Sequence, residues 1–189
     1  MAMDAERYKK LKKLLGSYGS WALWDPDDMN NTAYIESNYR KLKTEYVFVG
    51  LNTSRAIEDQ SAWTNYHFTH RGGKETRLAK VFTGTKFEGA YMTDIIKGFT
   101  STGSAKALDE WAASEELRAK SIKVIQKEFK ALGKVKMVYS FGKDACRLWH
   151  EIPKLAFYPA KIVTHFAARG NAFEENIRDE LGIVKPSNR

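Results

Sequence analysis

Three polar side chains stand at or near the ends of apolar, β-branched segments that lie far apart in the sequence. Asn52 follows segment 47–51, Asp94 lies within 90–97, and His165 follows 161–164. An amide can orient a water molecule, an imidazole can stabilise negative charge on a leaving group, and an ionised carboxylate accepts hydrogen bonds. If the fold brings these residues to one cleft, they predict a site for a reaction that develops negative charge.

An apolar run that stops at small and polar residues is typical of a buried parallel strand, and ligands bind beyond the carboxyl ends of such strands. We therefore expect neighbouring parallel strands over 46–51, 89–96, 136–141 and 161–165. Helical spacing, N-cap residues and glycine stops predict helices over 4–16, 32–43, 75–82, 114–133, 144–151 and 171–182, with a loop over 98–104. Strands that alternate with helices predict an α/β fold, a three-layer α/β/α sandwich with a short, mostly parallel central sheet.

The 189 residues fit one domain, 1–189, with an N-terminal helical extension over about 1–44. In helix 4–16 we expect Tyr8, Leu11, Leu14 and Leu15 to face the core and the lysines to face solvent. The alternative for that basic face is contact with DNA phosphate.

The net charge of +8 and the isoelectric point near 9.4 make a polyanion the expected partner, with DNA the first candidate. The alternative is a basic surface that serves solubility. The single cysteine, Cys146, excludes an intramolecular disulfide and fits a reducing cytoplasm, and we expect it to be buried in a helix.

Metal and membrane signals are weak. His67 and His70 have helical spacing but no neighbouring thiolate or acidic residue, so we expect no metal site. The sequence also lacks an apolar run of the length that a signal peptide or a membrane span needs. We expect a cytoplasmic monomer with no membrane partner and no cofactor.

The segments that carry Asn52 and His165 resemble motifs of the uracil-DNA glycosylase superfamily. Its first motif is a strand followed by Gly, an apolar residue or Gln, Asp or Asn, and usually Pro. Gly50-Leu51-Asn52-Thr53-Ser54 matches it, with Asn as in the mismatch-specific branch. Its second motif is a strand that ends in His or Asn before Pro-Ser, and His165 matches the first residue.

Two further segments are similar to the same family. Segment 90–97 resembles the strand that carries a base-recognition Asn, with Asp94 at that position, and 137–145 resembles the strand–Gly–helix unit before the second motif. The resemblance runs from 46 to 171, in the family's order. It implies the family's fold and a glycosylase that acts on a flipped base in DNA by N-glycosidic hydrolysis, without metal or organic cofactor.

In such a reaction the sugar becomes oxocarbenium-like and the leaving base becomes anionic. The resemblance implies that Asn52 orients water and that His165 donates to the base carbonyl. The expected substrate contacts are Gly50, Leu51, Thr53, Ser54, Asp94 and two aromatic residues, Tyr66 and Phe68, either of which is a candidate platform for stacking of the base. The expected nucleic-acid contacts are Arg71, Lys74, Arg169 and Asn171, although a plain solvated turn explains 71–74 equally well.

The chain also departs from the family's pattern. A carboxylate only accepts hydrogen bonds, so Asp94 would suit a base with amino or ring N–H groups and would repel a uracil carbonyl. Thr53 stands in place of Pro, and Phe166-Ala167 in place of Pro-Ser. These departures favour two alternatives: a non-catalytic binder of nucleic acid or nucleotide on the same fold, and an enzyme that acts on free nucleosides or nucleotides.

Each of the three polar residues has a purely structural interpretation as well. Asn52 could cap the turn that follows it, His165 could be a hydrogen-bonded side chain at a strand end, and Asp94 could cap a helix or pair with a lysine.

Overall fold

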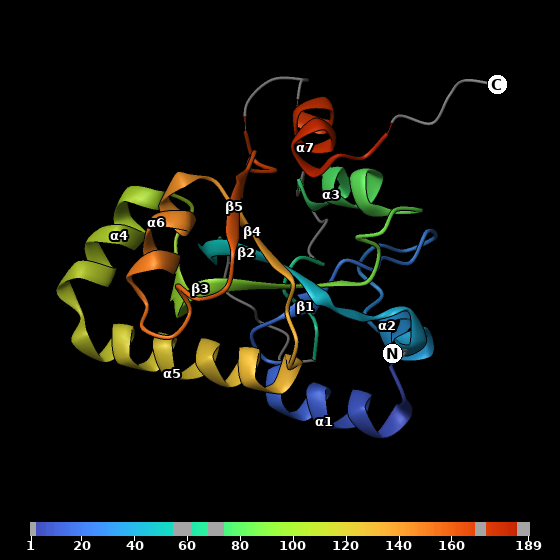
Figure 1. Cartoon of the computed structure of the whole chain (residues 1–189), viewed down its shortest axis with the longest axis horizontal. Coiled ribbons are helices and arrows are strands. Elements are labelled where there is room, and N and C mark those ends of the chain that lie inside the picture. The colour runs from blue at the N-terminus through green and yellow to red at the C-terminus, as the bar shows by residue number, and fades with distance from the viewer. Residues whose placement is uncertain (1–2, 55–61, 68–73, 169–172, 185–189) are drawn as a thin grey trace.

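The computed structural model describes residues 3–54, 62–67, 74–168 and 173–184. Its elements in chain order are α1 (Ala5–Leu15), β1 (Ser20–Trp21), α2 (Ala33–Ser37), the 3-10 helix η1 (Tyr39–Lys41), β2 (Lys43–Thr53), α3 (Glu75–Phe82), β3 (Ala90–Thr100), α4 (Ser104–Ala113), α5 (Glu115–Leu132), β4 (Met137–Phe141), α6 (Lys143–Glu151), β5 (Ala160–Val163) and α7 (Phe173–Leu181). Figure 1 shows the sheet in the middle of the molecule with helices on either side of it.

The central sheet has five strands in the order β1-β3-β2-β4-β5. Strands β2, β3, β4 and β5 run parallel to their neighbours, and the two-residue β1 pairs antiparallel with β3. The fold is therefore α/β, a three-layer α/β/α sandwich with a mostly parallel central sheet, as the sequence predicts. The four predicted strands are β2 to β5, so their carboxyl ends lie at one edge of the sheet.

Alternating side chains of each strand feed two separate cores, one on each face of the sheet. In β2, Val47 and Val49 pack in the core that α1, α4, α5 and α6 cover, whereas Phe48 packs in the core that α3 and α7 cover. Figure 1 shows α1 and α5 below the sheet and α3 and α7 above it. This arrangement explains why β2, β3 and β4 carry nearly continuous apolar runs: both of their faces are buried, whereas Lys161 and Ile162 of the edge strand β5 are exposed.

Local capping chemistry fixes several helix boundaries as predicted. The Ser114 side chain accepts a hydrogen bond from the Leu117 backbone N–H at the start of α5. Gly133 ends that helix with a positive φ of 79°, which a residue with a side chain adopts only with strain. The predicted helices over 75–82, 144–151 and 171–182 correspond to α3, α6 and α7, and Cys146 is buried in α6.

Several predicted boundaries are wrong. Strand β2 runs from Lys43 to Thr53 and so includes Asn52, and β5 ends at Val163, two residues before His165. The predicted helix over 32–43 is only one short helix and a 3-10 turn, because Lys43 already belongs to β2 and its N–H donates to the Gly89 carbonyl. The predicted loop over 98–104 is shorter, since β3 continues to Thr100 and α4 begins at Ser104. Pairing between strands thus overrides the local signal in these last two places.

The predicted inward face of α1 is correct at three positions and wrong at one. Tyr8, Leu11 and Leu15 are buried, whereas Leu14 is 50% exposed. The three buried residues already form the narrow stripe that one neighbouring surface can cover, and Leu14 lies at its edge. The lysines of α1 lie on the remaining surface of the helix, as expected.

Candidate functional site

A cleft of about 610 Å³ opens at the carboxyl edge of the sheet. It brings together Asn52 from β2, Asp94 from β3 and His165 from the segment after β5. Of the residues predicted to contact substrate or nucleic acid, the cleft is also lined by Gly50, Leu51, Thr53, Ser54, Tyr66 and Lys74. The predicted contacts Phe68, Arg71, Arg169 and Asn171 lie outside the described residues.

Asp94 is buried at the cleft wall and is held by neutral donors. The Tyr66 hydroxyl donates to its Oδ1 at 2.8 Å, and Asn65 Nδ2 donates to its Oδ2 at 2.9 Å. Thr53 Oγ1 adds a longer contact of 3.4 Å to Oδ2. Among the described residues Asp94 has no lysine partner and caps no helix, so the structural interpretation that the sequence left open is wrong. Its carboxylate is instead an acceptor fixed at the cleft wall.

Gly50 makes room for this arrangement. A Cβ atom at this position would collide with Asp94 Oδ1 and with the Tyr66 hydroxyl oxygen. The glycine of the first motif is therefore required because the carboxylate and the phenol cross directly over the β2 backbone.

Tyr66 holds Asp94 in place and does not offer a stacking surface. Its side chain is buried, and its hydroxyl lies within hydrogen-bond distance of both the Thr93 carbonyl and Asp94. Burial, reinforced by the Asp94 carboxylate, raises the pKa of Tyr66 well above its ordinary value, so the phenol keeps its proton. The predicted role of Tyr66 as a platform for a base is not supported by this burial.

Two aromatic residues that are not among the expected substrate contacts complete the wall. Phe141 ends β4, and Phe166 follows His165; both line the cleft. Phe166 is half-buried, and its ring stacks on His165 with 4.6 Å between the ring centroids and 17° between the planes. Among the described aromatic side chains that line the cleft, Phe166 is the one that is not fully buried. In the sequence, its position directly after His165 is the feature that could have indicated Phe166 as a cleft residue.

Asn52 uses its amide nitrogen to connect two segments of the cleft. Nδ2 donates to the Thr53 and Ser101 carbonyls, each at 2.9 Å, and so ties the end of β2 to the loop before α4. The structural role that the sequence allows for Asn52, capping of the turn after the strand, is thus present, because its side chain bonds to backbone carbonyls near that turn. None of the described residues donates to Oδ1, which leaves that oxygen available to orient water.

His165 is a neutral donor by its geometry and surroundings. Its Nδ1 accepts a hydrogen bond from the Ala167 N–H at 3.0 Å, so the proton of the neutral ring resides on Nε2. Burial lowers the pKa of His165 and outweighs the opposing effect of Asp94, and Lys74 lowers it further. At neutral pH the residue can therefore offer an Nε2–H group without carrying a charge.

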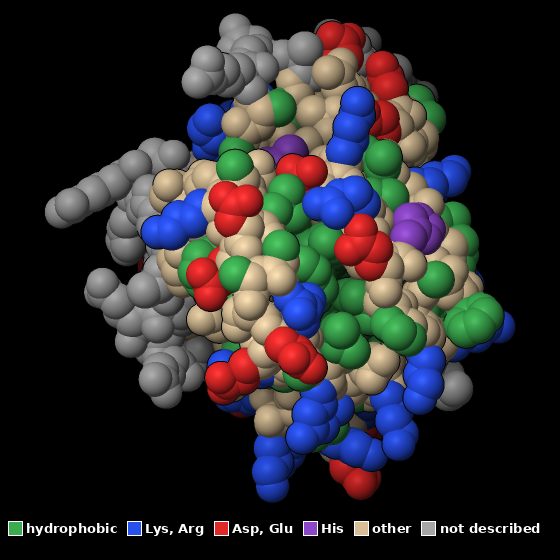
Figure 2. Space-filling model, turned by 90° about the vertical axis from the view of Figure 1, so that its left-hand side faces the viewer, with side chains coloured by type: hydrophobic (Ala, Val, Ile, Leu, Met, Phe, Trp, Pro, Cys, Tyr) green, Lys and Arg blue, Asp and Glu red, His purple; other side chains and the backbone are tan. Residues whose placement is uncertain are grey.

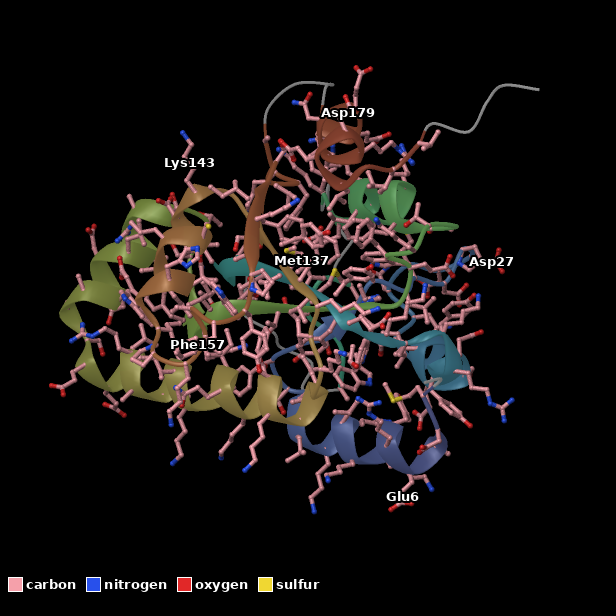
Figure 3. The ribbon with its side chains drawn as sticks, viewed as in Figure 1. Glu6, Asp27, Met137, Lys143, Phe157 and Asp179 are labelled. Atoms are coloured by element: carbon pink, nitrogen blue, oxygen red, sulfur yellow. The ribbon has the colours of Figure 1, made fainter. Side chains whose placement is uncertain are left out.

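Two helices begin at the cleft. Ser104 of α4 and Lys143 of α6 both line it, and their N-caps are Gly103 and Gly142, neither of which caps its helix through a side chain. The backbone N–H groups of the first turns are thus left for solvent or for an anion. Figure 3 shows Lys143 pointing away from α6 at the top of that helix. Lys74, which lines the same cleft, donates to the Ala167 carbonyl at 3.2 Å.

His67 does not line the cleft. It is buried, stacks on Trp24, and places its two ring nitrogens near the carbonyls of Trp21 and Met29. Within the described ranges no cluster of His, Cys, Asp and Glu residues is arranged to hold a metal ion.

No protein-family model matches this sequence, and a search of curated proteins gives no significant match. No helix within the described residues is both long enough and apolar enough to cross a membrane. The function is therefore inferred from the geometry of the cleft.

Proposed function

We propose that the protein is a DNA base glycosylase that hydrolyses the N-glycosidic bond of a base flipped out of DNA. The observation that carries the proposal is the convergence of Asn52, Asp94 and His165 on one cleft with an accessible aromatic ring. The volume of the cleft is within the range of small-molecule sites. The starts of α4 and α6, which no side chain caps, suit a phosphate that accompanies the base.

The reaction needs support for charge at two atoms. When the bond from the sugar C1′ to the base nitrogen breaks, the electron pair leaves with the base, and His165 Nε2–H donates to the base carbonyl where negative charge develops. The oxygen of a water molecule oriented by Asn52 Oδ1 then bonds to C1′. One proton of that water goes to solvent or to the departed base, so the products are an abasic sugar and a free base.

Asp94 sets the preference among bases in this proposal. Asp94 lines the cleft, and a carboxylate oxygen that already accepts one hydrogen bond from the protein can accept another from an amino or ring N–H group of a base. A uracil carbonyl at the same place meets a carboxylate oxygen and is repelled. The preferred substrate is therefore a base that presents a donor toward Asp94 and a carbonyl toward His165.

The second candidate is a binder of nucleotides or nucleic acid that performs no chemistry. The observation that favours it is that Asn52 Nδ2 and both oxygens of Asp94 are already engaged within the protein. Such a protein would retain salt-dependent affinity and release no base. An enzyme for free nucleosides would instead convert monomers and ignore polymers.

The experiment is single-turnover incubation with oligonucleotides that carry uracil, hypoxanthine, xanthine or a mismatch, followed by cleavage at abasic sites. We expect more product from hypoxanthine, xanthine or a mismatched base than from uracil, and loss of about two decades in rate for His165→Ala. His150→Ala is the matched control, since His150 is exposed on α6 and does not line the cleft. Absence of abasic product from every substrate, or full activity of His165→Ala, would reject the glycosylase proposal.

A further inference from the structure

The exposed side of α5 carries a regular row of lysines. Lys120, Lys123, Lys127 and Lys130 are all exposed, and their spacing alternates three and four residues, which keeps them on one side of the helix. The opposite side of α5 is buried against the sheet. At 1.5 Å per residue the four lysines extend over about 15 Å.

Helix α1 widens this basic surface. Lys9, Lys10 and Lys13 are exposed on α1, which packs against α5 and is fixed there by a hydrogen bond of 2.9 Å from Arg7 Nη2 to the Leu132 carbonyl. Below, the lysine face means the seven residues Lys9, Lys10, Lys13, Lys120, Lys123, Lys127 and Lys130. Long nitrogen-tipped side chains project downward from α5 and α1 in Figure 3, and Lys and Arg side chains gather along the lower edge of the molecule in Figure 2.

The charge of the lysine face is balanced only at its edges: exposed Glu116 lies four residues before Lys120, exposed Glu6 lies four residues before Lys10, and neither forms an ion pair with a lysine of the face. Between Leu117 and Leu132 the only acidic residue is Glu128, and it is buried, where it pairs with Lys97 at 2.9 Å. Among the described residues, none of the seven lysines forms an ion pair. By contrast, the neighbouring Lys12 is paired with Glu36 at 2.8 Å.

This arrangement opposes the stability of the helix. Like charges three or four residues apart destabilise a helix by about 0.2–0.5 kcal/mol for each pair. The row on α5 contains three such pairs, and an alternation of lysine with glutamate would be more stable and equally soluble. The row therefore fits an external ligand better than it fits a structural role.

We propose that the lysine face binds the phosphate backbone of double-stranded nucleic acid. One strand of B-DNA presents a phosphate about every 3.4 Å along its axis, so a length of about 15 Å offers roughly four phosphates to the four lysines of α5. The row of charges and the row of phosphates thus match in length and number. None of the seven lysines lines the cleft, so this surface is separate from the candidate active site.

An anionic membrane is a less suitable partner. Helices that bind bilayers insert large apolar side chains, whereas the apolar side of α5 is committed to the core of the protein. Of the exposed large apolar residues among the described ones, only Leu14 lies on α1 or α5; Phe157, Ile162 and Val184 lie elsewhere.

The test compares two triple variants with the same change in net charge. Lys123→Gln/Lys127→Gln/Lys130→Gln removes the centre of the lysine face, and Lys86→Gln/Lys154→Gln/Lys161→Gln removes three exposed lysines from parts of the surface away from both the lysine face and the cleft. Binding to an undamaged, fluorescently labelled duplex is measured by anisotropy between about 50 and 200 mM salt. Circular dichroism and thermal unfolding check that both variants are folded.

We expect the slope of log K against log salt to become shallower by about two to three units in the lysine-face variant and to change little in the control, because each phosphate contact contributes about 0.9. Equal changes in both variants, no change in either, or binding to phosphatidylserine vesicles in place of the duplex would overturn the inference. Since undamaged DNA offers no base to excise, these outcomes do not depend on the glycosylase proposal, and His165→Ala should leave the slope unchanged.

Discussion

Gly50 shows how one missing side chain makes room for the Asp94 wall of the cleft. A methyl group there would push against the Asp94 carboxylate and the Tyr66 phenol, both of which are buried and hydrogen-bonded. We expect Gly50→Ala to lose about 1–3 kcal/mol of unfolding free energy and to lose ligand binding in the cleft. Gly103→Ala is the control, because a Cβ atom at Gly103 meets open space. Urea unfolding measures both variants, and equal stability of the two would contradict the close approach at Gly50.

Asp94 allows a second test at this scale. In Asp94→Asn the new amide can donate to the Tyr66 oxygen while Tyr66 donates to the Thr93 carbonyl, and its oxygen can still accept from Asn65. We therefore expect stability within about 1 kcal/mol of wild type and a gain in uracil excision of roughly one to two decades. Asp94→Ala leaves those donors unpaired and should lose about 1–3 kcal/mol. Unchanged excision of uracil by Asp94→Asn would show that Asp94 does not read the base.

The sequence could locate Asn52, Asp94 and His165 because each follows or lies in a recognisable strand, and the ends of parallel strands meet. It could not show that Asn65 and Tyr66 hold Asp94, because these contacts join a loop to a strand almost thirty residues away. The same holds for the bond from Asn52 to the Ser101 carbonyl. Periodicity reports which side of an element is buried, and it carries no information about such long-range partners.

At the scale of elements, the strands were predictable and the short connecting pieces were not. Strands β2 to β5 are apolar runs that need no partner to be recognised. Strand β1 has two residues, and it exists because Ser20 and Trp21 pair with β3. Helix α4 was missed because it lies between a glycine-rich loop and the strong cap at Ser114, with only Ala107 and Trp111 buried.

His67 links β1 to the loop that precedes α2, and its burial predicts how that link responds to acid. Burial outweighs the two nearby carbonyls and lowers the pKa of His67 from 6.5 to about 4. The unfolded chain therefore binds more protons than the folded protein between these values, and stability is lost as the pH falls from about 6.5 to 4. The full effect is about 3 kcal/mol.

The measurement is urea unfolding at several pH values between about 7 and 4. We expect His67→Gln to be less stable at neutral pH but to lose this part of the pH dependence. His150→Gln, at an exposed position, should follow the wild-type curve. A wild-type curve that stays flat over this range would mean that the pKa of His67 is not lowered in the folded protein.

For the whole molecule, the net charge of +8 becomes meaningful through its distribution. Lys74 stands at the cleft, and the lysine face lies on α1 and α5, so the two could contact different parts of one duplex. If Lys74 contacts a phosphate, Lys74→Ala should reduce the salt slope of duplex binding by about one unit. A variant that combines Lys74→Ala with Lys123→Gln/Lys127→Gln/Lys130→Gln should show a salt slope that is shallower by about three to four units. The two reductions add because contacts without shared partners act independently.

The combined variant separates two arrangements of the complex. Additive slopes mean that a single duplex contacts the cleft and the lysine face together, so a base in the cleft and a flank on α5 belong to one bound state. A combined slope equal to that of the lysine-face variant alone would mean that Lys74 contacts no phosphate in that state. The cleft would then take a nucleotide or a single strand, while the duplex binds to α5 without entering the site.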